Sequence, residues 1–417
     1  MITSLILASA LALVPTQVLA ADNGLAITPQ MGWNTWNKYG CNIDEQLILD
    51  AAKSIVSSGL KDYGYNYVII DDCWQKNKRE KNKELLPDPT KFPRGMKALV
   101  DDIHDMGLKV GIYSSAGTLT CGGHIASLGY EETDAKTWAK WGMDYLKYDN
   151  CYNQGQSGTP KLSYDRYKAM SDALNNTGRP ILYSLCNWGE DGPWNFASTI
   201  ANSWRMSGDI YDNFNRADPA CPCETYDCLL PGFRCSVMNI INKAVAVGQK
   251  ARSGGWNDLD MLEVGNGGMS HEEYRLHYTM WAALKSPLLL GNDVTNMTSE
   301  TKEIIMNKEV IAVNQDSSYS PAVRMWVKGD QQMFSGNLAN NTQVVILLNA
   351  GDKAAKMTAT WDDIWFYSQP HVDASKSIEV RDLWKKQSLG NFTDRISLDV
   401  PAHGVRMIKF MDSAQSS

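Results

Sequence analysis

Acidic side chains follow short apolar runs at three separate places in the chain. Residues 146–151 pass from leucine to lysine, aspartate and cysteine, residues 69–74 repeat the design with two adjacent aspartates, and residues 204–209 end on a further aspartate. A buried parallel strand whose carboxyl end opens into an active site has this appearance. One such aspartate would be interpreted as a cap of the next loop. The repetition, and the adjacent like charges of Asp71 and Asp72, favour a functional cluster.

The residue types at these predicted strand ends are suited to sugar chemistry. The six histidines are scattered without metal-ligand spacing, and no G-x-S-x-G elbow is present. Tryptophan rings pack on the apolar face of a pyranose, and carboxylates, lysine and arginine bind its hydroxyl groups. We therefore predict a saccharide site that uses no metal and no cofactor. The candidates are Trp33, Asp71, Asp72, Tyr113, Lys147, Asp149, Trp188, Arg205, Asp209, Asp258 and Asp260.

Asp149 and Asp209 are the candidates for the two carboxylates that break a glycosidic bond. Lys147 lies two residues from Asp149, so its charge is expected to keep this carboxyl ionised, as a nucleophile requires. Asp209 has a less cationic local sequence and could hold the proton of a general acid. Arg205, four residues earlier, could instead lower the pKa of Asp209, and the sequence leaves these alternatives open.

Most tryptophans of a protein lie in its core, so the 14 tryptophans here must be divided between core and site. We predict substrate contacts only for Trp33 and Trp188, and assign the others, Trp36 included, to the core. Asp258 and Asp260 are interpreted as anchors of their loops.

Strands and helices alternate over most of the chain. Buried strands are predicted at residues 31–36, 67–74, 109–115, 144–151, 181–188, 203–210, 255–261 and 288–293. Helices are predicted at 44–58, 96–106, 134–141, 164–174, 237–250 and 270–284. Eight alternating units predict an α/β fold, a (β/α)8 TIM barrel whose site lies at the carboxyl ends of the strands. No glycine-rich phosphate loop of an open doubly wound sheet opens a helix.

Three segments are predicted: a signal peptide at 1–20, a catalytic barrel at 21–315 and a C-terminal domain at 316–417. After residue 314 short β-rich runs are separated by turn residues such as Gly329-Asp330. This pattern predicts an antiparallel β-sandwich with a structural role.

The composition restricts the class of partner. Hydrophobic residues make up 43% and aromatic residues 10% of the chain, enough for a substantial core. The net charge of −7 argues against nucleic acid and against an anionic membrane. A saccharide is the expected partner, and the oligomeric state, including a homo-oligomer, stays open.

Several features predict export to the extracellular space. Residues 5–13 are apolar and too short to span a bilayer, and cleavage is predicted after Ala20. Nine cysteines suit an oxidising compartment, and the spacing of the last four is poor for zinc. The predicted disulfides are Cys41–Cys73, Cys121–Cys151, Cys221–Cys235 and Cys223–Cys228, which leaves Cys186 unpaired. The predicted glycosylation sequons are at Asn175, Asn296, Asn340 and Asn391.

Four ordered motifs at the predicted strand ends resemble glycoside hydrolase family 27, the α-galactosidases of the melibiase type. They are Met31-Gly32-Trp33-Asn34-Thr35-Trp36, Asp71-Asp72-Cys73-Trp74, Lys147-Tyr148-Asp149-Asn150-Cys151 and Gly254-Gly255-Trp256-Asn257-Asp258. The resemblance extends over most of the chain and is greatest to secreted fungal members. It implies a retaining enzyme with Asp149 as nucleophile and Asp209 as acid/base.

The same resemblance implies roles for other residues. Asp71 and Asp72 would bind the 4- and 6-hydroxyls of galactose, and Lys147 and Arg205 the hydroxyls around C2 to C4. Trp33 would stack near C6. The resemblance further implies that the Cys121–Cys151 bridge lines the pocket and that Gln249 contacts substrate.

Two alternatives to an α-galactosidase remain at the level of sequence. Relatives cleave α-N-acetylgalactosaminides, and small residues in the loop after the fifth strand would admit the acetamido group. Here this loop, residues 186–190, carries the bulky Trp188, which favours galactose. The other alternative is a galactose-binding lectin on an inactive barrel, which the presence of both Asp149 and Asp209 disfavours.

Overall fold

The computed structural model describes residues 23–223, 232–364 and 375–411. The predicted signal peptide and Cys228 lie outside these described residues. Within them, no helix is both long enough and apolar enough to cross a membrane.

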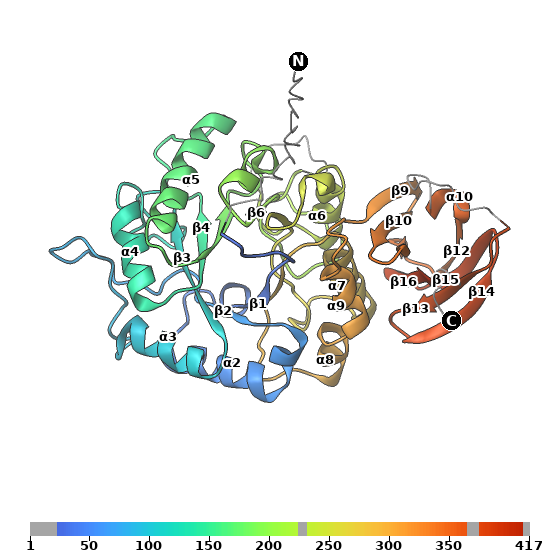
Figure 1. The fold of residues 1–417 in the computed structure, drawn as a ribbon, viewed down its shortest axis with the longest axis horizontal. Coiled ribbons are helices and arrows are strands. Elements are labelled where there is room, and N and C mark those ends of the chain that lie inside the picture. Colours follow the sequence, from blue (N-terminus) through green and yellow to red (C-terminus); the bar gives the residue numbers. More distant parts are fainter. Residues whose placement is uncertain (1–22, 224–231, 365–374, 412–417) are drawn as a thin grey trace, which may run out of the picture.

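Eight parallel strands form one sheet in the order β7-β6-β5-β4-β3-β2-β1-β8. The sheet closes because Leu262, in the segment after β7, forms a parallel bridge with Leu290 of β8. The barrel occupies the left part of Figure 1. Its strands are β1 (Met31–Asn34), β2 (Tyr67–Ile69), β3 (Lys109–Ser115), β4 (Tyr145–Asp149), β5 (Leu182–Cys186), β6 (Ser203–Arg205), β7 (Trp256–Asp258) and β8 (Leu288–Leu290). The predicted barrel is confirmed, with most strands shorter than expected.

The helices cover the outside of this barrel. In α2, Ile48, Ala51, Ala52 and Ile55 recur at helical spacing and are all buried, and the Asp44 side chain caps the first turn by accepting from the Leu47 N–H. The helices that follow the strands are α1 (Trp36–Tyr39), α2 (Glu45–Ser57), α3 (Gly95–Asp105), α4 (Glu131–Trp141), α5 (Pro160–Asn175), α6 (Val237–Ala244), α7 (His271–Ala283), α8 (Ser299–Ile305) and α9 (Lys308–Asn314). Neither α8 nor α9 was predicted.

Alternate residues of the strands serve two cores. Val68 of β2 belongs to the large cluster that includes the helices, whereas Tyr67 and Ile69 join a smaller cluster with Tyr145 and Leu182. Side chains of a strand alternate between faces, so the smaller cluster fills the barrel interior. The barrel is therefore a packed body, and only its rim is available for a site.

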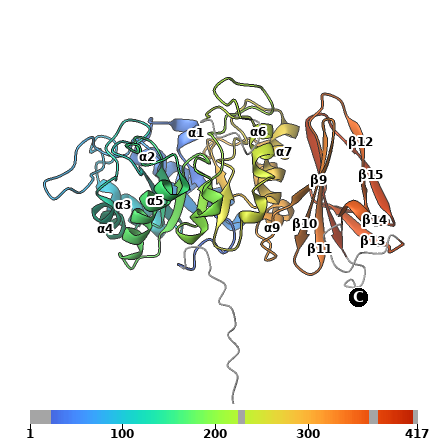
Figure 2. The ribbon, with the colours of Figure 1, turned by 90° about the horizontal axis from the view of Figure 1, so that it is seen from above.

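A six-stranded antiparallel sheet, β14-β13-β16-β11-β10-β9, and a two-stranded sheet, β12-β15, follow the barrel. Their strands are β9 (Val323–Lys328), β10 (Gln331–Leu338), β11 (Thr342–Asn349), β12 (Ala355–Thr360), β13 (Ile378–Asp382), β14 (Gln387–Phe392), β15 (Arg395–Val400) and β16 (Gly404–Met411), with a short helix α10 (Trp361–Ile364). Figure 2 shows this domain beside the barrel, against α7 and α9. The predicted β-sandwich is confirmed, but the polar edge strand β14 was not predicted.

The larger sheet packs on both of its faces. Val344, Ile346 and Leu348 of β11 join the core that includes the barrel helices, while Val345 and Leu347 pack towards β12 and β15. All eight residues of β11 are buried for this reason. The two domains therefore share a continuous apolar interface.

Candidate active site

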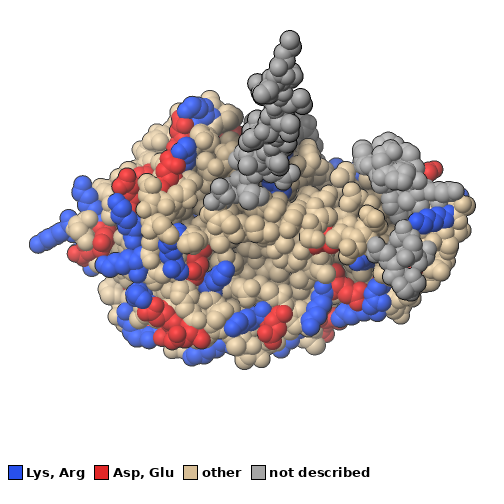
Figure 3. Space-filling model, in the orientation of Figure 1, with Lys and Arg blue, Asp and Glu red and all other residues tan. Residues whose placement is uncertain are grey.

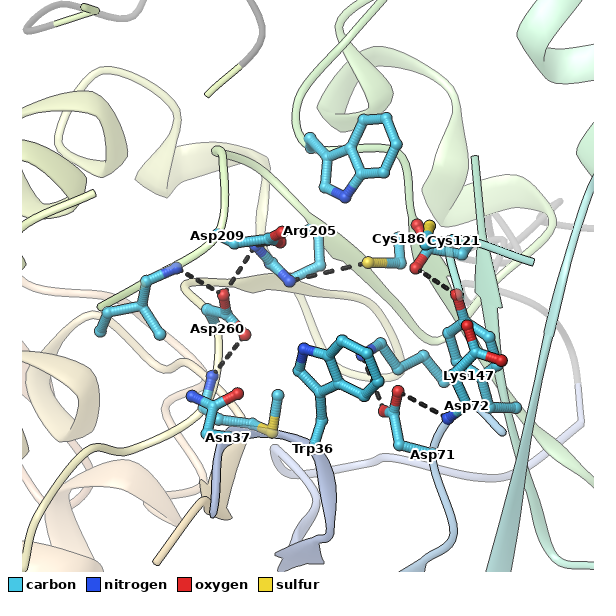
Figure 4. Close-up of a pocket in the computed structure, with 15 residues that line it drawn as sticks. Trp36, Asn37, Asp71, Asp72, Cys121, Lys147, Cys186, Arg205, Asp209 and Asp260 are labelled. Atoms are coloured by element: carbon cyan, nitrogen blue, oxygen red, sulfur yellow. Dashed lines mark hydrogen bonds and ion pairs between the residues drawn. The ribbon is translucent and has the colours of Figure 1, made fainter. Parts of the chain in front are cut away.

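A pocket opens at the carboxyl ends of the barrel strands (Figure 4). It collects side chains from β3, β4, β5 and β6 and from the segments that follow β1, β2, β3, β5, β6 and β7. The lining residues are Trp36, Asn37, Asp71, Asp72, Tyr113, Cys121, Lys147, Asp149, Cys186, Trp188, Arg205, Asp209, Ile210, Asp260 and Met261. Eight of the ten predicted catalytic and substrate-binding residues thus lie together in this pocket, and Trp33 and Gln249 do not line it.

Asp149 ends β4 and is only 5% exposed. Its Oδ2 accepts a hydrogen bond from the Tyr113 hydroxyl at 2.8 Å, and its Oδ1 accepts from the Asn150 N–H at 2.9 Å. These two donors fix both oxygens of the carboxylate. Burial raises the pKa of Asp149 to about 6, against the opposing charge of Lys147 and with a further increase from Asp209. Lys147 was expected to keep this carboxyl ionised; its charge does favour the ionised form, but desolvation outweighs it.

The ion pair that Lys147 makes is with Asp71. Lys147 Nζ lies 2.8 Å from Asp71 Oδ2, which also accepts from Asn34 Nδ2 at 2.7 Å. Burial opposes the charge on Lys147, but Asp71 and neighbouring acids outweigh it and hold the Lys147 pKa well above its ordinary value. The pair gives the pocket a fixed cation and a fixed anion side by side, each able to bind a hydroxyl.

Asp72 is held by the loop after β3. Its Oδ2 accepts from the Gly122 N–H at 2.7 Å, and the Cys121–Cys151 disulfide joins that loop to the end of β4. Burial raises the pKa of Asp72, and the Gly122 hydrogen bond opposes this increase. The loop backbone therefore orients Asp72, whereas the side chains of Asn34 and Lys147 orient Asp71.

Asp209 faces the pocket from the segment after β6 and is half exposed, with 49% of its side chain accessible. Arg205 Nη2 donates to Asp209 Oδ1 at 2.9 Å and lies 2.7 Å from Asp260 Oδ2 (Figure 4). The backbone is also held, because the Asp209 N–H donates to Gly232 O and its carbonyl accepts from the Cys235 N–H. The contact between Arg205 and Asp209, which the sequence left open, is therefore present in the structure.

The structure corrects two predicted substrate contacts. Trp33 is fully buried within β1, and its indole N–H donates to Asn292 O at 2.8 Å. β1 ends at Asn34, so the first aromatic residue beyond the strand is Trp36, and this is the tryptophan that lines the pocket. Gln249 lies in a 3-10 turn, Gly248–Lys250, before β7, where its amide bonds to Ala246 O. Parallel strands place this turn at the opposite end of the barrel from the pocket.

Four pocket residues had no role in the sequence-based prediction: Asn37, Ile210, Met261 and Trp36. All follow directly on strand ends or on predicted site residues. The first few residues after each strand end would have been candidates for the pocket, but the strands were predicted too long, so their ends were misplaced. Asp260, interpreted as a loop anchor, lines the pocket as well.

Trp188 lines the pocket from the loop after β5 and has a positive φ of 54°. The next residue, Gly189, has φ 81° and donates its N–H to Arg205 O. A Cβ on Gly189 would lie 2.4 Å from Met206 O, so the loop can rest on β6 only with glycine there. This close approach holds Trp188 over the site.

Three predicted disulfides are confirmed: Cys41–Cys73, Cys121–Cys151 and Cys221–Cys235. Cys223 is disulfide-bonded, and its predicted partner Cys228 lies outside the described residues. Cys186 is a free, buried thiol, as predicted. Burial raises its pKa well above the ordinary value, so it lies in the pocket as a neutral group. The asparagines of the four sequons are all exposed: Asn175, Asn296, Asn340 and Asn391.

The described residues offer little to a metal. Two groups of side chains bring ligand atoms within 4.8 Å of one another, Cys41 with Cys73 and His124, and Cys121 with Asp149 and Cys151. Each includes both sulfurs of a disulfide, which are not thiolate ligands.

On the surface in Figure 3, acidic and basic residues are interspersed rather than gathered by sign.

This arrangement defines a class of protein. A closed (β/α)8 barrel carries, at the carboxyl ends of its strands, a buried carboxylate and a second, half-exposed carboxylate, surrounded by aromatic rings and fixed charges. That is the site of a glycoside hydrolase that works with two carboxylates.

Comparisons with known proteins place the chain within this class. The family model described as alpha galactosidase A matches residues 28–316, and that of the alpha galactosidase C-terminal beta sandwich domain matches residues 328–410. The chain is 53% identical over 406 residues to alpha-galactosidase mel1 of Schizosaccharomyces pombe, covering 95% of this chain and 92% of the relative. The chain belongs to glycoside hydrolase family 27, the α-galactosidases of the melibiase type.

Solved structures agree with this assignment. The crystal structure of alpha-galactosidase I from Mortierella vinacea is 85% identical, with a TM-score of 0.93, and the match covers 95% of this chain and all of the other. The structure of an alpha-galactosidase from Saccharomyces cerevisiae with raffinose is 43% identical, with a TM-score of 0.91, covering 95% and 100% of the two chains.

Proposed function

We propose that the protein is a secreted, retaining exo-α-galactosidase that removes terminal, non-reducing α-D-galactosyl residues. The observation that carries the proposal is the pairing of Asp149 with Asp209 in one pocket. Asp149 is buried with both oxygens held by donors, whereas Asp209, in the segment after β6, is half exposed. A nucleophile needs a fixed position, and an acid/base needs access to the leaving group and to water.

In the first step Asp149 attacks C1 of the galactose while Asp209 gives its proton to the glycosidic oxygen. The bond from C1 to that oxygen breaks, the shortened saccharide leaves, and a β-linked galactosyl-enzyme remains. The Tyr113 hydroxyl and the Asn150 N–H keep the attacking carboxylate in place.

In the second step Asp209, now ionised, takes a proton from water as the water attacks C1 from the α face. The bond from C1 to Asp149 breaks and α-galactose leaves. Two inversions at C1 give net retention. Asp209 serves both steps because its exposed side allows a leaving group and then a water to approach.

The substrates proposed are raffinose-type oligosaccharides and the galactosyl side chains of galactomannans. The relative solved with raffinose supports the first of these. Asp71, Asp72 and Lys147 form the fixed polar wall that would bind the galactose hydroxyls, and Trp36 takes the stacking role first assigned to Trp33. The predicted signal peptide, the disulfides and the exposed sequon asparagines support secretion.

Galactose is favoured over N-acetylgalactosamine because the bulky Trp188 lines the pocket from the loop after β5. The family resemblance implies that small residues in this loop would be needed to admit an acetamido group. Hydrolysis of para-nitrophenyl α-galactoside should exceed that of the N-acetylgalactosaminide analogue by at least about 100-fold. Comparable rates would support the alternative substrate, and binding of galactose without any turnover would support a lectin.

Azide rescue tests the two catalytic roles separately. In Asp149→Gly, azide should attack C1 directly from the β face of an aryl α-galactoside and give β-galactosyl azide. In Asp209→Gly, the galactosyl-enzyme still forms from a good leaving group, and azide should give α-galactosyl azide. Exchanged products would reverse the two roles, and full activity of either variant without azide would overturn the mechanism.

A matched control lies at the other end of the same strand. Asp144 directly precedes β4 and pairs with His104 and Arg179, far along the strand from Asp149. Asp144→Asn should keep activity without azide and form no galactosyl azide.

A further inference from the structure

Asp260 is a buried carboxylate beside the proposed acid/base that the two-step mechanism does not use. It lies two residues beyond β7 and is 4% exposed. Its φ of 82° is unusual for an aspartate, and its carbonyl accepts from the Trp281 indole at 2.7 Å. Strained residues persist where the surroundings hold them, and they are frequent at functional sites.

The carboxylate of Asp260 joins the guanidinium of Arg205 to the backbone next to Asp209. Its Oδ2 lies 2.7 Å from Arg205 Nη2 and accepts from the Ile210 N–H at 2.8 Å. Its Oδ1 accepts from the Met261 N–H at 2.7 Å. Burial raises the pKa of Asp260, but the Arg205 charge and the Ile210 N–H oppose this increase. Among the described residues these partners are all N–H donors, which favour the ionised carboxylate.

Asp260 and Asp209 compete for the same nitrogen of Arg205. Nη2 lies 2.7 Å from Asp260 Oδ2 and 2.9 Å from Asp209 Oδ1. The two contacts differ in their exposure to water, because Asp260 is buried and Asp209 is half exposed. A charge pair away from water interacts more strongly, so Arg205 is neutralised mainly by Asp260.

This competition matters because Asp209 must carry a proton in the first step. An arginine paired with Asp209 alone would favour its ionised form and oppose proton donation. The other charged groups that face this part of the pocket are Lys147 and Asp149 of β4 and Asp258 of β7. The charge of Lys243 of α6 also acts on Arg205, and the Cys186 thiol of β5 is neutral. Asp260 is the acid that contacts Arg205 directly, at the shorter of the two distances.

We propose that Asp260 is a positioning residue for the acid/base. It holds Arg205 and the Asp209–Ile210 peptide in place. It also draws the guanidinium charge away from Asp209, so that Asp209 keeps the proton it donates. This inference rests on the proposed role of Asp209 and adds to it. It predicts a defect in protonation of the leaving group rather than in attack at C1.

The test compares two substrates in Asp260→Asn. Raffinose needs a proton on its leaving oxygen, whereas 2,4-dinitrophenyl α-galactoside does not. We expect kcat/KM for raffinose to fall about 10- to 100-fold, and that for the aryl substrate to change less than about threefold. The alkaline limb of the raffinose pH profile should move to lower pH by about one unit, because Arg205 now favours ionised Asp209.

Asp144→Asn is the matched control. It removes an acid that directly precedes β4 and pairs with His104 and Arg179 instead of Arg205. Its ratio of raffinose to aryl activity should equal that of the wild type. Equal losses on both substrates in Asp260→Asn, or an unmoved alkaline limb, would overturn the inference.

Arg205→Gln keeps the test decisive if Asp260→Asn does not fold. Without the guanidinium charge, the alkaline limb should move to higher pH, and an unmoved or lower limb would contradict the inference. Asp209→Asn separates this inference from the proposed function. Its kcat/KM for raffinose should be lost and its kcat/KM for the aryl substrate mostly kept, because attack at C1 by Asp149 needs no proton from Asp209 when the leaving group is good. If the kcat/KM values do not separate in this way, the role of Asp209 itself is wrong.

Discussion

At the scale of the residue, the site depends on an aspartate placed where its charge is costly. Asp149 is held by one hydroxyl and one backbone N–H, and burial raises its pKa to about 6. The Tyr113 hydrogen bond opposes that increase. A nucleophile with a raised pKa is less solvated and more reactive once it is ionised, so the pH dependence of the enzyme should reflect this carboxyl.

Tyr113→Phe should weaken Asp149, the proposed nucleophile, without removing it. The lost hydrogen bond to a charged group should lower kcat/KM about 10- to 100-fold. Because the hydroxyl lowers the Asp149 pKa, its removal raises that pKa, and the acid limb of the pH profile should move to higher pH. The profile of kcat/KM on para-nitrophenyl α-galactoside checks this. An acid limb that stays in place would show that Tyr113 does not act through Asp149.

Asp149→Asn should make the free enzyme more stable at neutral pH. The folded-state pKa of about 6 exceeds the ordinary 3.8, so the carboxylate opposes folding above about pH 6, and this penalty disappears as the pH falls to 3.8. The variant should gain up to about 3 kcal/mol in unfolding free energy at pH 7.5 and much less near pH 4. Urea unfolding at both pH values measures the difference, and an equal gain at both would refute this cause.

Much of the site could be predicted from residues alone, because acidic side chains after buried strands are conspicuous. The tryptophans could not be assigned in the same way. Trp33 and Trp36 are three residues apart in one motif, and only the end of β1 at Asn34 decides which of them is core. The raised pKa of Asp149 was also not predicted, because it depends on burial among residues far apart in the sequence.

At the scale of the element, loops between strands and helices bring the chemistry together. The loop after β5 presents Trp188 only because Gly189 passes close to Met206 O on the neighbouring strand end. The segment after β6 presents Asp209 because its backbone pairs with Gly232 and Cys235. These close contacts leave no signal in hydrophobic periodicity, which explains why strands were predicted but their exact ends were not.

Gly189→Ala should displace the loop that carries Trp188. The new methyl would meet Met206 O, and φ is 81°, so we expect a loss of about 2–4 kcal/mol in stability and a larger KM. Gly123→Ala is the control, with φ 82° and nothing within 4 Å of its Cβ, and it should cost about 1–2 kcal/mol. Thermal unfolding and steady-state kinetics on both variants test this. Equal changes in stability and KM in the two variants would show that the contact with Met206 is unimportant.

At the scale of the whole molecule, the sandwich supports the barrel through α7. Trp384 is buried between them, donating its indole N–H to Thr279 Oγ1 and lying under the guanidinium of Arg275. The same helix carries Trp281, which holds the Asp260 carbonyl in the site. The C-terminal domain, predicted from its short β-rich runs, is thus joined to the active site by one helix.

Trp384→Ala should lower the unfolding free energy by about 3–5 kcal/mol, because it leaves a cavity at the domain interface. Trp384→Phe retains most of the apolar volume and should lose clearly less. Calorimetry would measure both variants. If the alanine variant unfolds at the wild-type temperature, the interface does not contribute to stability as the packing indicates.

The anomer of the first sugar released tests the central claim most directly. Proton NMR of the purified wild-type enzyme acting on para-nitrophenyl α-galactoside distinguishes the two anomers before they interconvert. Attack by Asp149 followed by water, with Asp209 serving both steps, predicts α-galactose as the first product. If β-galactose appears first, a single displacement by water takes place, and Asp149 is not the nucleophile.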